Sequence, residues 1–297
     1  WIYHAGSQRF QDLNIFSRAQ DLRYGNSQSL EEFAFKAQVM AYDGHRAMFE
    51  AYSKNKYFTS TGVIQWMLNN PWPSLIWHLF DHSLRAGGSY FGAKKANEPL
   101  HIQYSYDDGS IVAVNQTLAA MSRLQARVQV LDFNLALILD KTITFDLGAD
   151  QSKTLMALPV INNITPSYFV RLVLKDNQNQ EVSHNFYWLS TQREVMDWDN
   201  TDFTGTPVLK EADLTQLNML PMSSVSVQKL QESQDKSTQK FVVENRSSNL
   251  AFFVDLRALD SHDQEILPAF WSDNEISLLP GEKRIITLSY SNSQLSK

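Results

Sequence analysis

Apolar residues between positions 28 and 55 recur at helical spacing. They follow one another at intervals of three, four or seven to eight residues, which places them on one face of a helix. Ser29 with Glu32 three residues later is a capping-box pattern, in which the two side chains satisfy free amides of the first turn. The pattern therefore predicts one amphipathic helix with a buried face, made by Phe33, Ala37, Met40, Ala41, Met48 and Tyr52.

The segment GVIQWMLNNPWPSLIWHLFD, residues 62 to 81, is apolar but is interrupted by two asparagines and two prolines. Its first part is a short apolar run entered through Gly62, which predicts a buried strand. A helical pattern, PSLIWHLFDHSL, resumes at Pro73. Helix, buried strand and helix in this order form an α/β unit with a parallel strand.

From about residue 99 the hydrophobic period changes to two, which is typical of strands. HIQYSYDDGSIVAVN predicts two strands about an Asp-Asp-Gly turn, and Leu124, Ala126, Val128 and Val130 alternate with polar residues in RLQARVQV. YFVRLVLKDNQNQEVSHNFYWL predicts a further pair. The same pattern returns in SSVSVQKL, KFVVEN, LAFFVDLRAL and GEKRIITLSYS, after the segment DWDNTDFTGTPV. Two consecutive β-sandwiches of about 90 to 100 residues each explain this pattern, with QESQDKSTQ as a hairpin loop.

Composition excludes several classes of function. The chain has 297 residues, a net charge of −6 and no cysteine. The charge gives no basic surface for nucleic acid or for an anionic membrane, and no apolar run reaches the roughly 20 residues of a membrane span. Without cysteine, disulfides, thiolate nucleophiles and cysteine-based metal sites are excluded.

The acidic residues of the first hundred positions do not predict a catalytic pair. A sugar hydrolase normally needs two carboxylates about 5 to 10 Å apart. Glu31, Glu32 and Glu50 are expected on the solvated face of the first helix, and Asp43 also at a helix surface. Asp81 and Glu98 flank the second predicted helix, where capping or interdomain pairing is the expected role.

Other catalytic and metal-binding patterns lack essential parts. His78 and His82 lie four residues apart on a predicted helix, which is the spacing of two zinc ligands, but no third ligand is indicated. Neither a glycine-rich phosphate loop nor a Gly-x-Ser-x-Gly elbow is found. We therefore expect no metal and no cofactor.

Trp66, Asn69, Asn70 and Trp72 form an aromatic and amide cluster. An indole face stacks on the C–H face of a sugar, and side-chain amides pair with its hydroxyls. Trp66 ends the predicted parallel strand, where ligands of α/β barrels bind, although a core position for it is equally compatible with the pattern. Trp77, on the following helix, is expected in the core. The asparagines are expected at the rim of the pocket.

Residues 42 to 115, from YDGHRAMFEAYSKN through GVIQWMLNNPWPSLIWHLFD to HIQYSYDDGSIVAVN, resemble one part of glycoside hydrolase family 2. That part joins the catalytic barrel to the following sandwich in the branch of exo-β-D-glucosaminidases and mannosylglycoprotein endo-β-mannosidases. NFYWLS and FWSDNEISLLPGE are similar to sandwich sequences of the same branch. The opening on Trp1 also indicates a piece of a longer protein.

The resemblance implies a mixed, mainly β fold in three parts. Residues 1–97 would be the C-terminal part of a (β/α)8 barrel, and residues 98–200 and 201–297 two immunoglobulin-like β-sandwiches. Gly62 to Leu68 would be the eighth barrel strand. Such a piece leaves apolar faces exposed, so we expect it to associate with the rest of the parent enzyme or with a second copy.

The resemblance also implies a retaining glycosidase whose acid/base and nucleophile lie upstream of Trp1, so this chain alone is expected to be inactive. Its pocket-wall residues would be Trp66, Asn69, Asn70 and Trp72. The substrate would be a β-linked glucosaminide such as chitosan, or alternatively a β-mannoside. The partners would be carbohydrate and the rest of the enzyme, and the location secreted or periplasmic.

A non-catalytic carbohydrate-binding or structural module is the alternative from another class. Trp188, Trp198 and Trp271 could then offer stacking surfaces. Trp188 lies in the strand pattern NFYWLS and is expected in the core. Trp198 lies in the acidic segment MDWDNTD, and either an exposed position or a plug between domains fits it.

Overall fold

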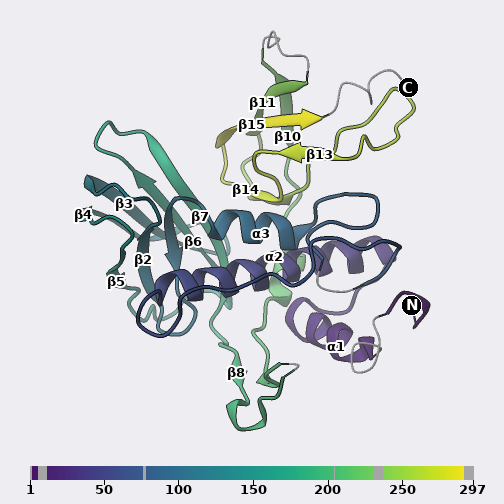
Figure 1. The fold of residues 1–297 in the computed structure, drawn as a ribbon, viewed down its shortest axis with the longest axis horizontal. Helices are drawn as coiled ribbons and strands as arrows, with labels where there is room; N and C mark the ends of the chain where they lie inside the picture. The colour runs from purple at the N-terminus through teal and green to yellow at the C-terminus, as the bar shows by residue number, and fades with distance from the viewer. Residues whose placement is uncertain (1, 6–11, 76–77, 204, 231–236, 291–297) are drawn as a thin grey trace.

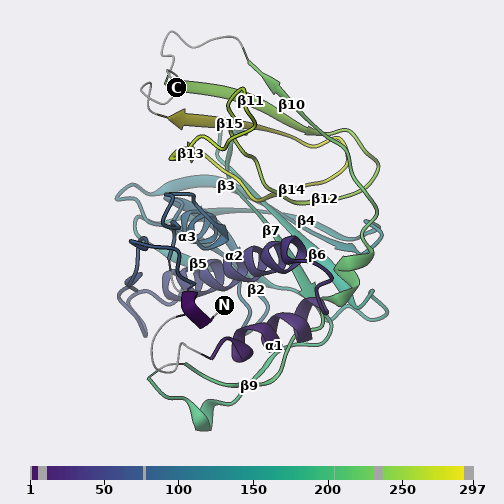
Figure 2. The same ribbon diagram turned by 90° about the vertical axis from the view of Figure 1, so that its right-hand side faces the viewer.

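The computed structural model describes residues 2–5, 12–75, 78–203, 205–230 and 237–290. The helices α2 (Leu30–Lys54) and α3 (Gly88–Ala96) lie beside the first β-sandwich and below the second, and α1 (Leu13–Tyr24) lies further from both (Figure 1). In Figure 2 the second sandwich stands above the helices and a two-stranded hairpin extends below them. The fold is mainly β, as the sequence predicts. The predicted boundary at residues 200/201 falls inside this hairpin, formed by β8 (Val195–Met196) and β9 (Val208–Lys210).

The predicted helix is confirmed as α2 (Leu30–Lys54), but its predicted buried face is wrong. The predicted residues are only partly buried and Tyr52 is exposed, whereas the buried residues of α2 are Lys36, Val39, Tyr42, Asp43, Arg46 and Glu50. Ser29 Oγ accepts a hydrogen bond from the amide of Glu32 at 3.1 Å, so the predicted N-cap is formed. The Glu32 carboxylate reaches one residue further back than in a capping box and accepts from the Gln28 amide at 2.7 Å. Two shorter helices, α1 (Leu13–Tyr24) and α3 (Gly88–Ala96), were not predicted.

The strand predicted at Gly62 to Leu68 is wrong, and the described residues 73–75 and 78–84 of the predicted second helix are not helical. Instead the chain turns back on itself. The Leu68 carbonyl accepts from the amides of Leu79 and Phe80, and Asn69 forms an isolated bridge with Phe80. A parallel strand needs a ladder of hydrogen bonds with a neighbouring strand, and residues 62–68 belong to none of the sheets in the described part of the chain. Trp77 lies outside the described residues.

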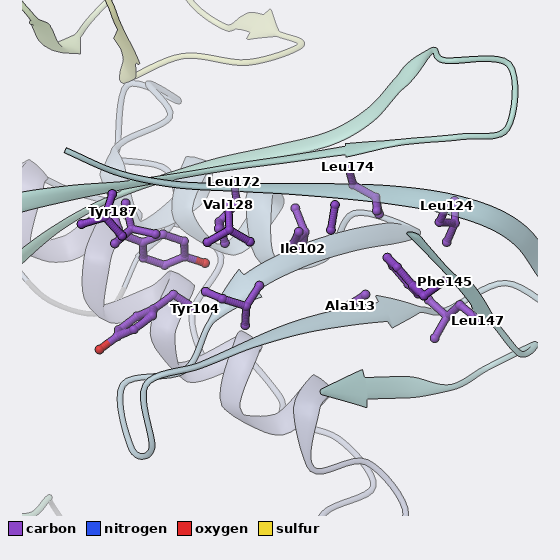
Figure 3. Close-up of a cluster of buried hydrophobic side chains, with 14 of the residues drawn as sticks. Ile102, Tyr104, Ala113, Leu124, Val128, Phe145, Leu147, Leu172, Leu174 and Tyr187 are labelled. Carbon is purple, nitrogen blue, oxygen red and sulfur yellow. The ribbon is translucent and has the colours of Figure 1, made fainter. Parts of the chain in front are cut away.

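The first sandwich consists of two antiparallel sheets that face each other, one of three strands and one of four. The strand orders are β1-β2-β5 and β4-β3-β6-β7. The predicted alternation in β3 is confirmed, since Leu124, Ala126, Val128 and Val130 are all buried. Figure 3 shows part of the core that these residues share with residues of the opposite sheet, such as Ile102 and Ala113. The strands are β1 (Leu100–Tyr104), β2 (Ser110–Asn115), β3 (Met121–Asp132), β4 (Leu137–Leu147), β5 (Ser152–Ala157), β6 (Ser167–Lys175) and β7 (Glu181–Ser190).

The second sandwich is smaller. Its four-stranded sheet has the order β10-β11-β15-β13 and faces the pair β12-β14. Residues 231–236 of the predicted hairpin loop lie outside the described residues, but the strands on either side of them, β10 and β11, are antiparallel neighbours. The strands are β10 (Val225–Lys229), β11 (Thr238–Asn245), β12 (Ala251–Val254), β13 (Ala269–Trp271), β14 (Ile276–Leu278) and β15 (Lys283–Tyr290).

Both sandwiches contain the same asparagine turn, which the sequence analysis missed. In the first, the amide of Asn115 donates to the carbonyls of Ala119 and Gly148, each at 2.8 Å, and its oxygen accepts from Thr117. In the second, Asn245 donates to the carbonyls of Asn249 and Leu278 at 2.7 and 2.8 Å. The Asn245 oxygen accepts from Ser247 in the same way. Both asparagines are fully buried. The two sandwiches therefore each close a turn with the same set of hydrogen bonds from a buried asparagine.

Helices α2 and α3 approach so closely that only glycine fits at their contact. A Cβ atom added at Gly92 would lie 2.9 Å from the carbonyl carbon and 3.1 Å from the Cα of Tyr42. At Gly88, one turn earlier, it would lie 3.0 Å from the carbonyl carbon of Gln38. Real carbon atoms prefer separations of about 3.5–4.0 Å. The two glycines thus set the distance between the helices.

An apolar cluster joins the helices to both sandwiches. Tyr42 of α2 lies 6.0 Å from the ring of Trp188 in β7 and 5.6 Å from the ring of Phe253 in β12. Trp188 is buried, which confirms its predicted core position. One cluster contains residues of the helices and of both sandwiches. If the helices or either sandwich were removed, apolar surface on the remaining parts would become exposed.

Candidate functional site

The predicted pocket-wall residues lie on the irregular segment between α2 and α3. Trp66 is 83% exposed, and Asn69 is also exposed. An exposed indole can stack on the apolar face of a sugar ring, and a nearby amide can pair with a hydroxyl. The predicted sugar-binding role of these two side chains stays a prediction.

Trp72 belongs to a small aromatic cluster with the 3₁₀ helix Ile2–His4 (η1). Its ring is stacked on His4 with 5.9 Å between the centroids, and it meets Tyr3 edge-on at 5.4 Å. His4 also forms a hydrogen bond of 2.5 Å with the carbonyl of Pro73, and its own carbonyl accepts from the Leu75 amide. These contacts fix the orientation of Trp72.

The expectation that both asparagines lie at the rim is wrong for Asn70. Its side chain is only 2% exposed. The amide nitrogen donates to the Ser74 carbonyl at 3.2 Å and lies 2.6 Å from Nδ1 of His78. Since the loop turns back after Pro71, its own carbonyls need a donor, and Asn70 supplies it. Asn70 thus holds the loop that presents Trp66 and Trp72.

The solvated positions expected for Asp43 and Glu50 are wrong, because both carboxylates are buried. Arg46, between them on α2, pairs with Asp43 at 2.9 Å and lies 3.9 Å from the centre of the Tyr187 ring. The spacing of three and four residues puts Asp43, Arg46 and Glu50 on one helix face. That spacing was the signal in the sequence: three charged residues share one helix face with Val39 and Tyr42, and this face is not the one that carries the predicted apolar residues.

Glu50 forms the centre of a buried polar cluster between α2, β1 and β7. Its Oε1 atom accepts from Tyr187 at 2.7 Å and from Asn185 at 2.8 Å, and it lies 2.9 Å from Nε2 of His101. Burial by itself lowers the pKa of His101, but the hydrogen bonds to Glu50 and Glu98 raise it above the ordinary histidine value. Burial also raises the pKa of Tyr187 well above that of an ordinary tyrosine.

This cluster is closed to substrates. Arg46 and His101 are fully buried, and Glu50 is 1% exposed. A general acid or base must come within hydrogen-bond reach of the group it acts on, and no sugar can enter here. The cluster instead fastens α2 to the first sandwich. That the chain holds no catalytic carboxylate pair stays a prediction.

The predicted zinc-type spacing of His78 and His82 is not on a helix, since residues 78–87 are irregular. Among the residues that the structure describes, no group of three or more histidine, aspartate or glutamate side chains is arranged to hold a metal ion. Within the same residues, no helix has the length and apolar character needed to cross a membrane.

A polar pocket of about 260 Å³ lies on the outer face of the four-stranded sheet of the first sandwich, away from all predicted site residues. Its cations are already engaged: Arg127 pairs with Asp140, and Arg171 with Glu282. It has no aromatic wall, and its lining residues are Gln125, Arg127, Thr142, Arg171, Val173, Lys175, Asn179 and Glu181.

Trp198 is 72% exposed in the short 3₁₀ helix Trp198–Asn200 (η3), which lies between β8 and β9. The exposed alternative is therefore confirmed and the interdomain plug is wrong within this chain. Trp271, at the end of β13, is half-buried against Phe241.

Comparison with known proteins assigns both sandwiches. Residues 203–297 match the exo-beta-D-glucosaminidase Ig-fold domain, and residues 108–194 match the mannosidase Ig/CBM-like domain. The exo-beta-D-glucosaminidase of Streptomyces avermitilis is 41% identical, and the alignment covers 99% of this chain but 34% of that enzyme. A mannosylglycoprotein endo-beta-mannosidase of Lilium longiflorum is 25% identical, over 98% of this chain and 35% of that enzyme.

The crystal structure of the exo-chitosanase CsxA of Amycolatopsis orientalis superimposes with a TM-score of 0.93 at 38% identity, covering 99% of this chain and 36% of that one. The chain thus spans about a third of the length of the relatives it matches. The likeness extends over the helices and the irregular segment as well as both sandwiches. The chain belongs to the branch of glycoside hydrolase family 2 that contains the exo-β-D-glucosaminidases and the β-mannosidases.

Proposed function

We propose that this chain is part of a retaining exo-β-D-glucosaminidase that acts on β-linked glucosaminides of the chitosan type. The observation that carries the proposal is the high identity to such enzymes along the whole chain, 41% against 25% for the endo-β-mannosidase. A β-mannosidase of the same family is the second candidate, favoured by the mannosidase-type first sandwich.

The first hundred residues support an association with the rest of such an enzyme. Large apolar side chains of the irregular segment face solvent, with Phe58, Ile64 and Trp66 all more than four-fifths exposed. α1 adds Ile15 and Leu22. Monomeric proteins rarely leave apolar patches of this kind uncovered. We infer that the remaining barrel of the parent enzyme covers them.

Within that assembly Trp66 and Trp72 would line the wall of the sugar pocket, and Asn69 would pair with a hydroxyl. The acid/base and nucleophile would come from the part of the enzyme outside this chain, because the buried carboxylates Asp43 and Glu50 are sealed among their partners. The chain alone is therefore expected to be inactive.

Hydrolysis of p-nitrophenyl β-D-glucosaminide and p-nitrophenyl β-D-mannoside by the longer enzyme and by this chain tests the proposal. We expect the longer enzyme to prefer the glucosaminide and this chain to show no turnover of either. Preference for the mannoside would favour the second candidate, and turnover by this chain alone would contradict the division of roles.

The alternative of a binding module has one specific observation in its favour, the exposure of Trp198. Titration with glucosamine oligomers, followed by tryptophan fluorescence, separates the two sites. A response lost in Trp66→Ala supports the pocket wall, and one lost in Trp198→Ala supports the module. We further propose a secreted or periplasmic location, which fractionation of the producing cells would test.

A further inference from the structure

The hairpin of β8 and β9 is an arm that projects from the molecule on the side opposite the second sandwich (Figure 2). Both of its ends are held by Arg23 of α1, which pairs with Glu194 before β8 and with Glu211 after β9. The distance from Arg23 Nε to the Glu211 carboxylate is 2.8 Å, and the Leu214 amide donates to the Arg23 carbonyl at 2.7 Å. The arm is therefore anchored at its base.

The tip of this arm presents Trp198 to solvent on a hydrogen-bonded turn. The Asp197 amide donates to the Pro207 carbonyl at 2.8 Å, and the Thr201 amide donates to the Trp198 carbonyl at 3.3 Å. The hydroxyls of Thr201 and Thr206 lie 3.1 Å apart. Trp198 contributes its backbone to this turn and is itself 72% exposed. Its indole is thus a flat apolar surface of the kind that stacks on the C–H face of a sugar ring.

The groups beside this indole carry negative charge. Residues 197–206 contain Asp197, Asp199 and Asp202 and no lysine, arginine or histidine. Asp197 already accepts from the Asn200 side chain at 2.8 Å. Asp199 is exposed, and none of the residues that the structure describes forms a hydrogen bond or an ion pair with its carboxylate. A carboxylate only accepts hydrogen bonds, so its strongest partners are cations such as an ammonium group. An aromatic face beside an unpaired carboxylate therefore suits a sugar that is positively charged.

We propose that the tip of the β8–β9 hairpin binds a cationic polysaccharide, a chain of β-linked glucosamine, with one ring stacked on Trp198 and an ammonium group paired with Asp199. The inference rests on the proposed function, because it takes the amino-sugar substrate from there and adds a second place at which a polymer of it is held. A neutral chain would gain only the stacking. The polar pocket on the first sandwich does not suit the same ligand, since Arg127, Arg171 and Lys175 line it and would repel a cation.

Binding of soluble oligosaccharides to this chain, measured by isothermal titration calorimetry, tests the proposal. The probes are glucosamine hexamer, N-acetylglucosamine hexamer and cellohexaose, which share the β-linkage but carry an ammonium, an acetamide or a hydroxyl at the 2-position. At low ionic strength we expect the glucosamine hexamer to bind about two- to fivefold more tightly than the other two, which is the range of one exposed ion pair. This difference should shrink as salt screens the charges.

Two variants separate the stacking from the charge. Trp198→Ala should weaken the binding of all three hexamers by about tenfold, because the aromatic face is lost. Asp199→Asn should leave the affinity for cellohexaose unchanged and abolish the preference for the glucosamine hexamer. The matched control is Asp263→Asn, which removes the same charge from an exposed turn of the second sandwich and should keep the preference. All three replaced side chains are exposed, so the fold should not change.

Equal affinity for the glucosamine hexamer and for cellohexaose would overturn the cationic ligand. Affinities that do not change in Trp198→Ala, or a preference that persists in Asp199→Asn, would overturn the site.

Hydrogen exchange at residues 198–203 tests whether the rest of the longer enzyme occupies the same surface. Exchange as fast in the longer enzyme as in this chain supports a free surface, whereas strong protection would show that the hairpin is covered and would overturn the proposal. The proposed function fails on a different result: it is contradicted if the longer enzyme does not hydrolyse p-nitrophenyl β-D-glucosaminide, whatever this chain binds.

Discussion

Replacing Gly92 with alanine tests whether the close contact between α2 and α3 stabilises the fold. The new Cβ would lie 2.9 Å from the carbonyl carbon of Tyr42, about 0.6–1.1 Å inside the usual carbon–carbon separation. The atom it meets is backbone and cannot rotate away, so the helices must move apart. Overpacking of this kind costs about 1–3 kcal/mol, and the contact also presses on the apolar cluster around Tyr42.

Alanine has a better helix propensity than glycine by about 1 kcal/mol. With an overpacking cost at the upper end of its range, the free energy of unfolding of Gly92→Ala should therefore fall by roughly 2 kcal/mol. Gly44→Ala is the matched control, because Gly44 is exposed on α2 and a Cβ there meets no atom within 4 Å. The free energy of unfolding of Gly44→Ala should rise by about 1 kcal/mol. Identical chemistry at the two sites is therefore expected to change stability in opposite directions.

Guanidinium unfolding followed by far-ultraviolet circular dichroism measures both variants against the parent chain. Gly92→Ala should lower the midpoint of the transition that includes the helices, and Gly44→Ala should raise it. A midpoint for Gly92→Ala that rises as much as that of Gly44→Ala would show that the helices can separate without loss, and a lowered midpoint for Gly44→Ala would mean that the contact is not the cause.

Arg46→Met leaves a buried carboxylate without its partner and should cost about 3–5 kcal/mol in the same unfolding assay; a loss below about 1 kcal/mol would contradict the assigned pairing. Asn245→Ala removes two buried donors and should cost about 2–3 kcal/mol, whereas Ser247→Ala removes one hydroxyl of the same turn and should cost under about 1.5 kcal/mol; equal losses would rule out the asparagine as the centre of the turn. Glu98 and Glu181, whose pKa values are lowered to about 2, should stabilise the chain above the ordinary glutamate pKa, and this contribution should disappear as the pH falls towards 2. In thermal unfolding from pH 5 to pH 2, the melting temperature of Glu181→Gln should therefore fall less steeply with pH than that of the parent chain. An unchanged slope would refute the pairing of Glu181 with His184 and Arg284.

The strands were predictable from the sequence because each carries its own signal. Period-two alternation in β3 and the Asp-Asp-Gly turn between β1 and β2 depend on residues that are neighbours in the chain. The helix α2 was predictable for the same reason, from its cap and the helical spacing of its apolar residues, but the face that it buries was not. Its polar residues were not, because burial of Glu50 depends on β1 and β7, which lie 50 and 130 residues further on.

The structure of residues 62–81, in contrast, could not be predicted from the local sequence pattern. Its apolar run satisfies the local pattern of a buried strand, but a strand forms only with hydrogen-bonded neighbours. The chain instead satisfies its backbone groups locally, through Leu68, Asn69 and Asn70. Trp66 and Asn69 therefore face solvent where the sequence predicts a pocket wall, and their role in sugar binding stays a prediction.

The asparagine turns have a practical consequence for producing the protein. Asn115-Gln116-Thr117 and Asn245-Arg246-Ser247 both fit the Asn-x-Ser/Thr acceptor sequence for N-linked glycans. In each case the nitrogen that would carry the glycan is the atom that closes the turn, and it has no exposure to accommodate a sugar. A eukaryotic secretory host that modified either site during synthesis would trap the sandwich in an unfinished state, so a bacterial host without that modification suits this chain better.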